Sequence, residues 1–314
     1  MGIVPGSFDV TGSEALAAPG PLRCETIAVH RLVRGEDGRI RGRESEVSLD
    51  GYSRFKHGDE RWARRFGHEV ADMLLSRKSA LFRSGTMRSE RVLLASFPYK
   101  YVPTAAANMV DHTLARINHV LTGSGRPAAG LLHVFKYPWQ ASIEHYFPTM
   151  SEKERRLMLG NVRLSVDRSR LEGAHLVVID DVRVTGATQD MLLTFLSEVP
   201  GLASLTVAFL CDVAPEVARE NPAVEFEINH HEVTTLEHVE AIAKSGEFRW
   251  NVRVAKFVLE ERDEAAFDAF VLTLGDRHLE ELYRSATLNE YHFEEKYRRK
   301  MGVLAAEMER RELV

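Results

Sequence analysis

Residues 175–188 read HLVVIDDVRVTGAT, an apolar run followed by two carboxylates and a tight turn. The run predicts a buried strand that delivers Asp180 and Asp181 to its carboxyl end, and the TGAT turn at 185–188 opens directly into a helix. Backbone N–H groups at such a turn favour an anion, glycine lets the backbone approach it, and the hydroxyls of the turn add donors. The carboxylates can accept hydrogen bonds from sugar hydroxyls and offset positive charge on the ring. The stretch therefore predicts a phosphosugar site, and the weaker alternative is a capped strand end with two solvated acids.

The surrounding segments alternate between helix and strand patterns. We expect a first helix from Asp59, because Trp62, Phe66 and Val70 follow it at helical spacing. Further expected strands are 92–95, 131–135 and 205–210, and further expected helices are 104–121, 152–159 and 187–196. Strands that are apolar throughout need burial on both faces, and right-handed crossovers then favour an open, doubly wound parallel sheet of the α/β class. Ligands of such a sheet gather at the carboxyl ends of its strands.

The two ends of the chain depart from this pattern. Residues 24–49 read as two β-leaning runs around a turn signal at 35–38, a hairpin that lies outside the main pattern. Beyond about residue 215 we expect a last strand at 252–259 and then helices. We therefore divide the chain into 1–50, a leader and β-hairpin that is a candidate hood, 51–215, the α/β core, and 216–314, the last strand and a helical extension that is also a candidate hood.

At residues 175–188 the chain resembles the type I phosphoribosyltransferases, whose loop for phosphoribosyl diphosphate (PRPP) has two acidic residues followed by a Thr-Gly-x-Thr turn. The resemblance implies that Asp180 and Asp181 hold the ribose hydroxyls. It also implies that the 5-phosphate is bound by four turn residues, Thr185, Gly186, Ala187 and Thr188. The segments 53–59, 96–100, 135–140 and 151–156 are similar in order and spacing to the ComF-like branch of this superfamily. The whole chain is also similar to the ComF-like members found among bacterial tellurite-resistance and stress genes.

The segment SFPYK at 96–100 follows the first expected core strand. Exposed N–H groups in such a turn, beside Lys100, can bind a diphosphate. The resemblance makes it the pyrophosphate loop, with Pro98, Tyr99 and Lys100 at the substrate. The alternative is a Pro-stiffened turn with a solvated lysine.

A long loop from Lys136 to Ser151 follows the next expected strand, and long loops in compact domains are usually functional or disordered. It matches the family's flexible catalytic loop in position. Lys136, Gln140, His145 and the following Arg155 are candidates to reach the diphosphate. We expect the loop to be mobile without PRPP and to become ordered on binding it.

The resemblance implies transfer of the 5-phosphoribosyl group from PRPP to a nitrogen nucleophile with release of pyrophosphate. Purine-salvage members carry an acid three positions after the second acidic residue, and Val184 stands there instead, which argues against salvage of 6-oxopurines. Mg²⁺ is the implied cofactor, held mainly by the phosphates of PRPP, with Asp180 and Asp181 reaching it at most through water. The alternative is a non-catalytic PRPP-sensing or scaffold protein. The flexible loop with Lys136 and Arg155 favours an enzyme over this alternative.

Composition narrows the classes of partner. The 314 residues include 41 Lys+Arg and 46 Asp+Glu, a formal net charge of −5, which argues against nucleic-acid binding through bulk charge and favours small-molecule partners. Cys24 and Cys211 lie far apart, so neither a disulfide framework nor a structural zinc site is indicated. No apolar run reaches the length of a membrane span and no secretory signal is recognisable, so we expect a cytoplasmic protein, with a homodimer left open.

Two further patterns are weaker. Residues 2–9 are similar to the opening of nucleotidylyltransferases, but the His-x-Gly-His that should follow is missing. His230, His231, Glu232 and His238 suggest a metal site, yet their spacing is not HExxH and the stretch alternates like an exposed strand. We therefore interpret the first as a leader and the second as a solvated segment.

Overall fold

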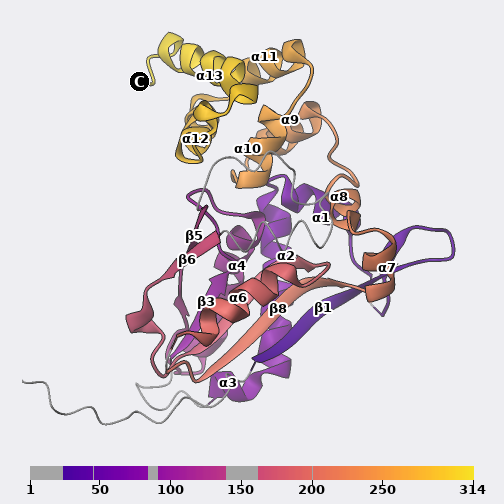
Figure 1. Cartoon of the computed structure of the whole chain (residues 1–314), viewed down its shortest axis with the longest axis vertical. Helices are drawn as coiled ribbons and strands as arrows, with labels where there is room; N and C mark the ends of the chain where they lie inside the picture. The colour runs from indigo at the N-terminus through magenta and orange to yellow at the C-terminus, as the bar shows by residue number, and fades with distance from the viewer. Residues whose placement is uncertain (1–23, 45, 84–90, 139–161, 200) are drawn as a thin grey trace, which may run out of the picture.

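The structure, a computed structural model, describes residues 24–44, 46–83, 91–138, 162–199 and 201–314. Its centre is a six-stranded sheet in the order β2-β1-β8-β7-β3-β4, in which all neighbours are parallel except β1 and β2 (Figure 1). The strands are β1 (Cys24–Arg34), β2 (Ile40–Gly42), β3 (Val92–Ser96), β4 (Gly130–Leu131), β7 (His175–Arg183) and β8 (Ser204–Val213). This mostly parallel sheet confirms the α/β fold predicted from the apolar runs.

Helices cover both faces of the sheet. They are α2 (Glu60–Arg77), α3 (Ser79–Arg83), α4 (Ala105–Gly123) and α6 (Ala187–Ser197). Val177 and Ile179 of β7 belong to the apolar cluster that contains the buried residues of α2 and α4. The alternate residues Leu176 and Val178 belong to a second cluster with α6. Successive side chains of a strand point to opposite faces, so this division shows why β7 lacks polar alternation.

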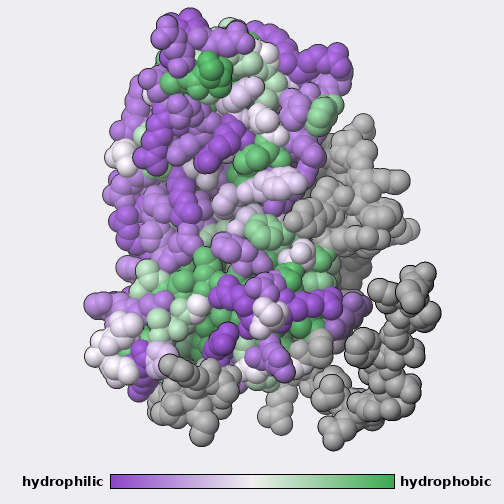
Figure 2. All heavy atoms as spheres, turned by 90° about the vertical axis from the view of Figure 1, so that its left-hand side faces the viewer, coloured by the Kyte–Doolittle hydropathy of each residue, from purple (hydrophilic) through white to green (hydrophobic). Residues whose placement is uncertain are grey.

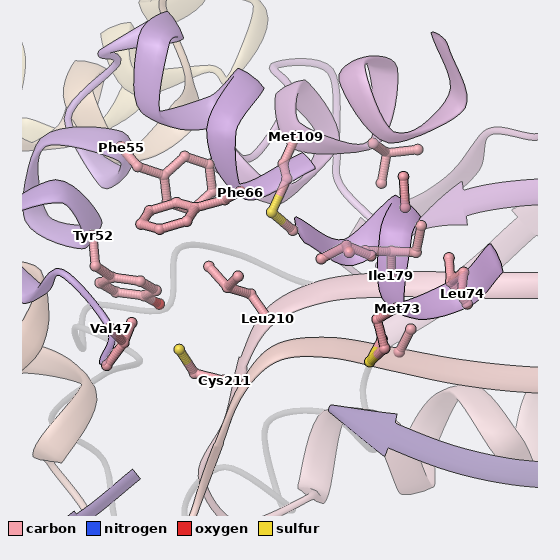
Figure 3. Close-up of a cluster of buried hydrophobic side chains, with 14 of the residues drawn as sticks. Val47, Tyr52, Phe55, Phe66, Met73, Leu74, Met109, Ile179, Leu210 and Cys211 are labelled. Atoms are coloured by element: carbon pink, nitrogen blue, oxygen red, sulfur yellow. The ribbon is translucent and has the colours of Figure 1, made fainter. Parts of the chain in front are cut away.

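Helix α1 (Leu49–Lys56) brings aromatic side chains to the same core (Figure 3). Phe55 of α1 meets Phe66 of α2 edge to face, with ring centroids 5.7 Å apart. The α2 N-terminus is capped by Asp59, whose carboxylate accepts a hydrogen bond from the backbone N–H of Arg61 at 3.1 Å. The predicted helix start at Asp59 is thus confirmed, and the packing fixes Lys56, at the end of α1, beside the sheet.

The expected position of the N-terminal hairpin is wrong. Strand β1 pairs in parallel with β8 from Cys24↔Leu205 to Leu32↔Val213, so it is part of the main sheet. Only the short strand β2 folds back on it as the second arm of the hairpin. The pattern of β1 is that of a half-buried strand near the edge, and periodicity does not tell which distant strand will be its neighbour.

The last strand expected at 252–259 is also wrong, because this segment is helix α10 (Val252–Leu259). Its letters VRVAKFVL alternate at first, which imitates a half-buried strand. Asn251 nevertheless caps the segment as a helix, accepting hydrogen bonds from the N–H groups of Arg253 at 2.9 Å and Val254 at 3.1 Å. The buried residues Val254, Ala255, Val258 and Leu259 then form one helical face.

The strand expected at 131–135 is divided between two sheets. Its first part is β4, at the edge of the main sheet, and its second part is β5 (Val134–Pro138), which pairs antiparallel with β6 (Val162–Val166). The chain leaves this ribbon at Pro138 and returns at Val162, which are paired with each other. The expected helix at 152–159, most of the 136–151 loop and the leader up to residue 23 lie outside the described residues.

The chain after β8 continues as helices, namely α7 (Pro215–Glu220), α8 (Val224–Asn229), α9 (Leu236–Lys244), α10, α11 (Glu264–Thr273), α12 (Asp276–Leu288) and α13 (Arg298–Arg310). Helices α7 and α8 pack into the core cluster, and α9 to α13 form a layer at one end of the molecule (Figure 1). From Val233 onward they enclose an apolar cluster of their own. Hydrophilic residues cover most of this layer on the face shown in Figure 2. In the part of the chain that the structure describes, no helix has both the length and the apolar character needed to cross a bilayer.

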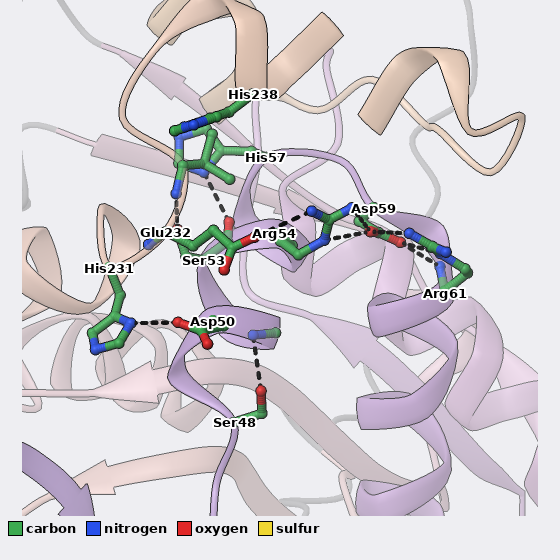
Figure 4. Close-up of polar contacts among 12 residues, drawn as sticks. Ser48, Asp50, Ser53, Arg54, His57, Asp59, Arg61, His231, Glu232 and His238 are labelled. Atoms are coloured by element: carbon green, nitrogen blue, oxygen red, sulfur yellow. Dashed lines mark hydrogen bonds and ion pairs between the residues drawn. The ribbon is translucent and has the colours of Figure 1, made fainter. Parts of the chain in front are cut away.

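Ser53 of α1 joins the core to this layer (Figure 4). Its buried hydroxyl donates a hydrogen bond to the carbonyl of Asn229 at 2.7 Å. The same oxygen accepts hydrogen bonds from the backbone N–H groups of Glu232 at 3.2 Å and Val233 at 2.9 Å. One hydroxyl therefore satisfies three backbone groups that turn the chain from α8 toward α9.

We expect Ser53→Ala to lower the free energy of unfolding by about 2–4 kcal/mol, because one buried carbonyl and two N–H groups lose their partner. Urea unfolding followed by circular dichroism measures the change. The control is Ser197→Ala, since the exposed Ser197 hydroxyl makes a hydrogen bond only within α6, to the carbonyl of Thr194 at 2.7 Å. Equal stability of the two variants would contradict this joining role.

Candidate active site

A cavity of about 1290 Å³ opens at the carboxyl ends of β3 and β7, between the sheet and the C-terminal helices. Each predicted site residue that the structure describes lines this cavity. Those residues are Pro98, Tyr99, Lys100, Lys136, Asp180, Asp181, Thr185, Gly186, Ala187 and Thr188. Arg155 lies outside the described residues. Three segments that are far apart in the sequence thus meet at the place where a parallel sheet binds its ligands.

The two carboxylates at the end of β7 have different surroundings. Asp181 is buried, forms an ion pair with Lys56 and accepts a hydrogen bond from the N–H of Val182 at 2.8 Å. Asp180 is half-buried, and among the described residues no ion pair involves it. Burial and the neighbouring Asp181 charge raise the pKa of Asp180 well above its ordinary value. Asp180 is therefore the carboxylate left for a ligand, while Asp181 neutralises Lys56.

The turn after β7 has the geometry of an anion site. Gly186 adopts a left-handed conformation, with φ of 78°, and is the N-cap residue of α6. Because glycine has no capping side chain, the N–H groups that follow Ala187 in the first turn of α6 are left for a ligand. The Thr185 hydroxyl accepts a hydrogen bond from the N–H of Ala187 at 3.4 Å, which tightens the turn.

The segment 96–100 is fixed on both sides. The N–H of Tyr99 donates to the carbonyl of Val134 at 3.4 Å, and the N–H of Lys136 donates to the carbonyl of Tyr99 at 2.9 Å. Lys100 forms an ion pair with Glu290, from the segment after α12. The alternative of a solvated lysine is therefore wrong, since Lys100 ties the core to the C-terminal layer.

Glu290 reaches Lys100 from an uncommon backbone conformation. Its φ of 64° lies in the left-handed region, which non-glycine residues seldom occupy. It stands between α12 and the short 3-10 helix at Tyr291–Phe293, so the chain turns sharply above the cavity. Phe293 also lines the cavity and is 78% exposed, which leaves an aromatic face at the cavity wall unoccupied by protein.

The sequence-based prediction missed several charged residues of the cavity. Arg253 of α10 forms an ion pair with Glu225 at 3.5 Å, and Lys56 lies 3.8 Å from the same carboxylate. Burial lowers the pKa of Arg253 to about 10. Lys256, one turn along α10, lines the cavity as well. The available signals were the Asn251 cap in front of α10 and the place of Lys56 in the 53–59 segment.

The donor chemistry of the cavity suits a magnesium ion carried by phosphates. In the described part of the chain, no place brings together three or more His, Cys, Asp or Glu side chains that could hold a metal. Asp180 offers a hard carboxylate oxygen at the cavity, whereas the Asp181 carboxylate is engaged by Lys56. Mg²⁺ accepts such a site, because it keeps several waters and binds through one or two carboxylates together with substrate phosphates.

The histidine-rich segment after α8 makes structural contacts with helix α1. His231 contacts Asp50 of α1 at 2.8 Å, and Arg54 of α1 reaches Glu232 at 3.3 Å (Figure 4). His238 accepts a hydrogen bond from the N–H of Thr234 at 3.3 Å. The expected exposed strand is wrong, because a turn follows α8 here and His238 lies in α9. The other weak pattern, at residues 2–9, lies outside the described residues.

Comparison with known proteins identifies a family whose matched residues include the whole cavity lining. The family model described as PRTase ComF-like matches residues 36–304. A search of curated proteins gave no match. A solved hypoxanthine phosphoribosyltransferase from Staphylococcus aureus is 13% identical over 48% of this chain and 64% of that chain, with a TM-score of 0.31. One from Trypanosoma cruzi, complexed with the product IMP, is 16% identical over 49% of this chain and 66% of that chain, with a TM-score of 0.32. The chain thus spans less than two thirds of the length of both solved structures.

Proposed function

The chain belongs to the family of ComF-like phosphoribosyltransferases, and on that premise we propose that it transfers the 5-phosphoribosyl group of PRPP to a nitrogen nucleophile. The observation that carries the proposal is one cavity with a carboxylate pair at one strand end and a glycine turn at the start of α6. A phosphosugar needs both features, hydroxyl acceptors for the ring and N–H donors for the phosphate.

The reaction is a substitution at the anomeric carbon. The bond from C1 to the diphosphate oxygen breaks, and its electron pair leaves with pyrophosphate. The lone pair of the acceptor nitrogen forms the new C1–N bond, and the nitrogen gives up one proton to solvent. Positive charge develops on the sugar ring on the way, so catalysis rests on electrostatic stabilisation and positioning.

In this proposal each cavity residue has one task. The N–H groups of the 185–188 turn bind the 5-phosphate, and Asp180 accepts a ribose hydroxyl and faces the developing positive charge. Asp181 orients the sugar while its charge is balanced by Lys56. Lys136 and the 98–100 segment face the diphosphate, and Arg155 is assigned to it by the family resemblance.

Mg²⁺ completes the proposal as an ion that arrives with PRPP. When bound, it neutralises part of the charge of the departing diphosphate. Asp180 would hold the ion through water, and the residues of the turn and of 98–100 would bind the phosphates.

The acceptor differs from a 6-oxopurine in this proposal. Val184 lines the cavity in the position where an acid would exchange a proton with the purine ring, and valine cannot do so. The C-terminal layer supplies the rest of the acceptor wall, including Phe293 and Lys256. We propose that residues 216–314 act as the hood and that β1 and β2 belong with the 51–215 core.

Pyrophosphate release from PRPP and Mg²⁺ over a panel of nitrogenous acceptors tests the proposal. We expect release that depends on one chemical class of acceptor and that stays at background when the acceptor is omitted. Binding of PRPP is measured in parallel by calorimetry. Tight PRPP binding without release for any acceptor would contradict catalysis and support the non-catalytic, PRPP-sensing function.

A further inference from the structure

Most charged groups of the cavity are already matched by opposite charges. The matched pairs are Lys56 with Asp181, Arg253 with Glu225, Lys100 with Glu290, Arg183 with Asp212 and Lys296 with Glu294. These pairs neutralise the acids and bases of the wall without any ligand. Apart from the N–H groups of the 185–188 turn, such a cavity attracts an anion through cations that have no acidic partner.

Two lysines of the described cavity wall are not matched by an acidic group in this way. Lys136 on β5 and Lys256 on α10 both line the cavity and are half-buried. Among the described residues, neither takes part in an ion pair. Burial is the main cause that lowers the pKa of Lys136, and the positive charge of Lys256, which lines the same cavity, lowers it further. Burial is also the main cause that lowers the pKa of Lys256. Two half-buried ammonium groups that lack an ion-pair partner are stabilised by an anion bound in the cavity that they share.

The position of the pair identifies the anion. Lys136 lies beside the 98–100 segment, because its backbone N–H donates to the carbonyl of Tyr99 at 2.9 Å. Lys100, the cation that the sequence assigned to the diphosphate, is held by Glu290. The charge needed to receive two phosphates is therefore available at Lys136 and Lys256, one contributed by the core and one by the C-terminal layer.

We propose that Lys256 and Lys136 form a two-lysine site that binds the diphosphate group of the substrate. The proposal rests on the proposed function and assigns a binding role to the C-terminal layer beyond covering the acceptor. An acidic group on the acceptor has the same chemistry, so the experiment separates the two sources of anion.

The test is calorimetry of the full chain with Mg²⁺ and three probes, namely inorganic pyrophosphate, PRPP and ribose 5-phosphate. We expect Lys256→Gln to weaken binding of pyrophosphate and of PRPP by about 10-fold to 100-fold, the size of a lost charged hydrogen bond. Ribose 5-phosphate, which lacks the diphosphate, should bind as before. Lys256→Arg, which keeps the charge, should restore most of the affinity.

Lys296→Gln is the matched control. Lys296 lines the same cavity, but Glu294 at 3.6 Å and Glu260 at 3.8 Å already match its charge. We expect less than about a 2-fold change in pyrophosphate binding for this variant. An equal loss in both variants would show a general charge effect and overturn the two-lysine site.

Two further outcomes decide the proposal separately from the proposed function. Unchanged binding of pyrophosphate and PRPP by Lys256→Gln, with acceptor affinity alone reduced, overturns it even if the enzyme turns over. Loss of pyrophosphate binding in Lys256→Gln supports it even if no acceptor ever gives turnover, a result that would contradict only the proposed function.

Discussion

Gly186→Val is expected to weaken PRPP binding at least about 100-fold while the chain stays folded. The reason lies in the backbone, because a Cβ added at Gly186 would meet no atom within 4 Å. At the φ of 78° found here, a β-branched residue is strained by about 1–3 kcal/mol. The turn relieves this strain by changing its conformation, and the N–H groups around it then no longer converge on one phosphate.

Calorimetry with PRPP and Mg²⁺ measures the loss, and Gly246→Val provides a matched control. Gly246 has a φ of 79° and equally open space around its added Cβ, but it lies between α9 and α10, away from the cavity. Both variants should show a similar small fall in melting temperature. Only Gly186→Val should lose PRPP, and unchanged PRPP affinity in that variant would exclude the 185–188 turn as the phosphate site.

The part of the site that the sequence predicts best is the part made by one continuous segment. The apolar run of β7, the two carboxylates and the glycine turn follow each other within 175–188, and the structure places all of them at one cavity. Each signal there depends on its neighbours in the chain alone. Local patterns of this kind are read correctly because no distant contact has to be known.

The predictions that were wrong concern segments whose structure depends on contacts with residues far away in the sequence. Strand β1 joins β8, about 180 residues away, and nothing in its own letters names that neighbour. The segment 252–259 alternates like a strand but is a helix, because its apolar face packs into the C-terminal cluster. Because this segment imitates a strand, its pattern also gives no sign that Arg253 and Lys256 line the cavity.

Lys56 shows a third limit. Its place in the 53–59 segment marked it as part of the family resemblance, but its role came only with the fold, which buries it against Asp181. A buried ion pair of this kind joins helix α1 to strand β7 across 125 positions of sequence. Removing the Asp181 charge is expected to lower the stability of the fold, whereas removing the Asp180 charge is not. An experiment can therefore distinguish the two carboxylates.

We expect Asp180→Asn to lower kcat by about 100-fold to 1000-fold and to change PRPP affinity by less than about 10-fold. In the proposed function the Asp180 carboxylate faces the sugar, so its charge matters most when the ring becomes positive. In the ground state an amide can still accept a hydroxyl hydrogen bond, which is why binding is affected less. Steady-state kinetics of pyrophosphate release and PRPP calorimetry give the two numbers.

Asp181→Asn and Asp72→Asn provide the comparisons. Asp181→Asn leaves the buried Lys56 with Glu225, at 3.8 Å, as its one acidic partner among the described residues. We therefore expect the free energy of unfolding to fall by about 3 kcal/mol and the activity to fall as well. Asp72 is exposed on α2 and pairs with Arg116 at 3.2 Å, away from the cavity, so its variant should match the unmodified chain. Asp180→Asn should therefore differ from both, with normal stability and low kcat.

The pH dependence of kcat gives an independent check on Asp180. Its pKa is raised by burial and by Asp181, so the carboxylate takes up a proton at a higher pH than an ordinary aspartate does. Activity carried by the charged form is then present above the raised pKa and is lost as the pH falls through it. Asp180→Asn has no such proton to take up, so the acidic limb of its profile should disappear along with most of its rate. A variant that keeps the same acidic limb, or that loses PRPP affinity as strongly as kcat, would show that Asp180 binds the sugar without stabilising its positive charge.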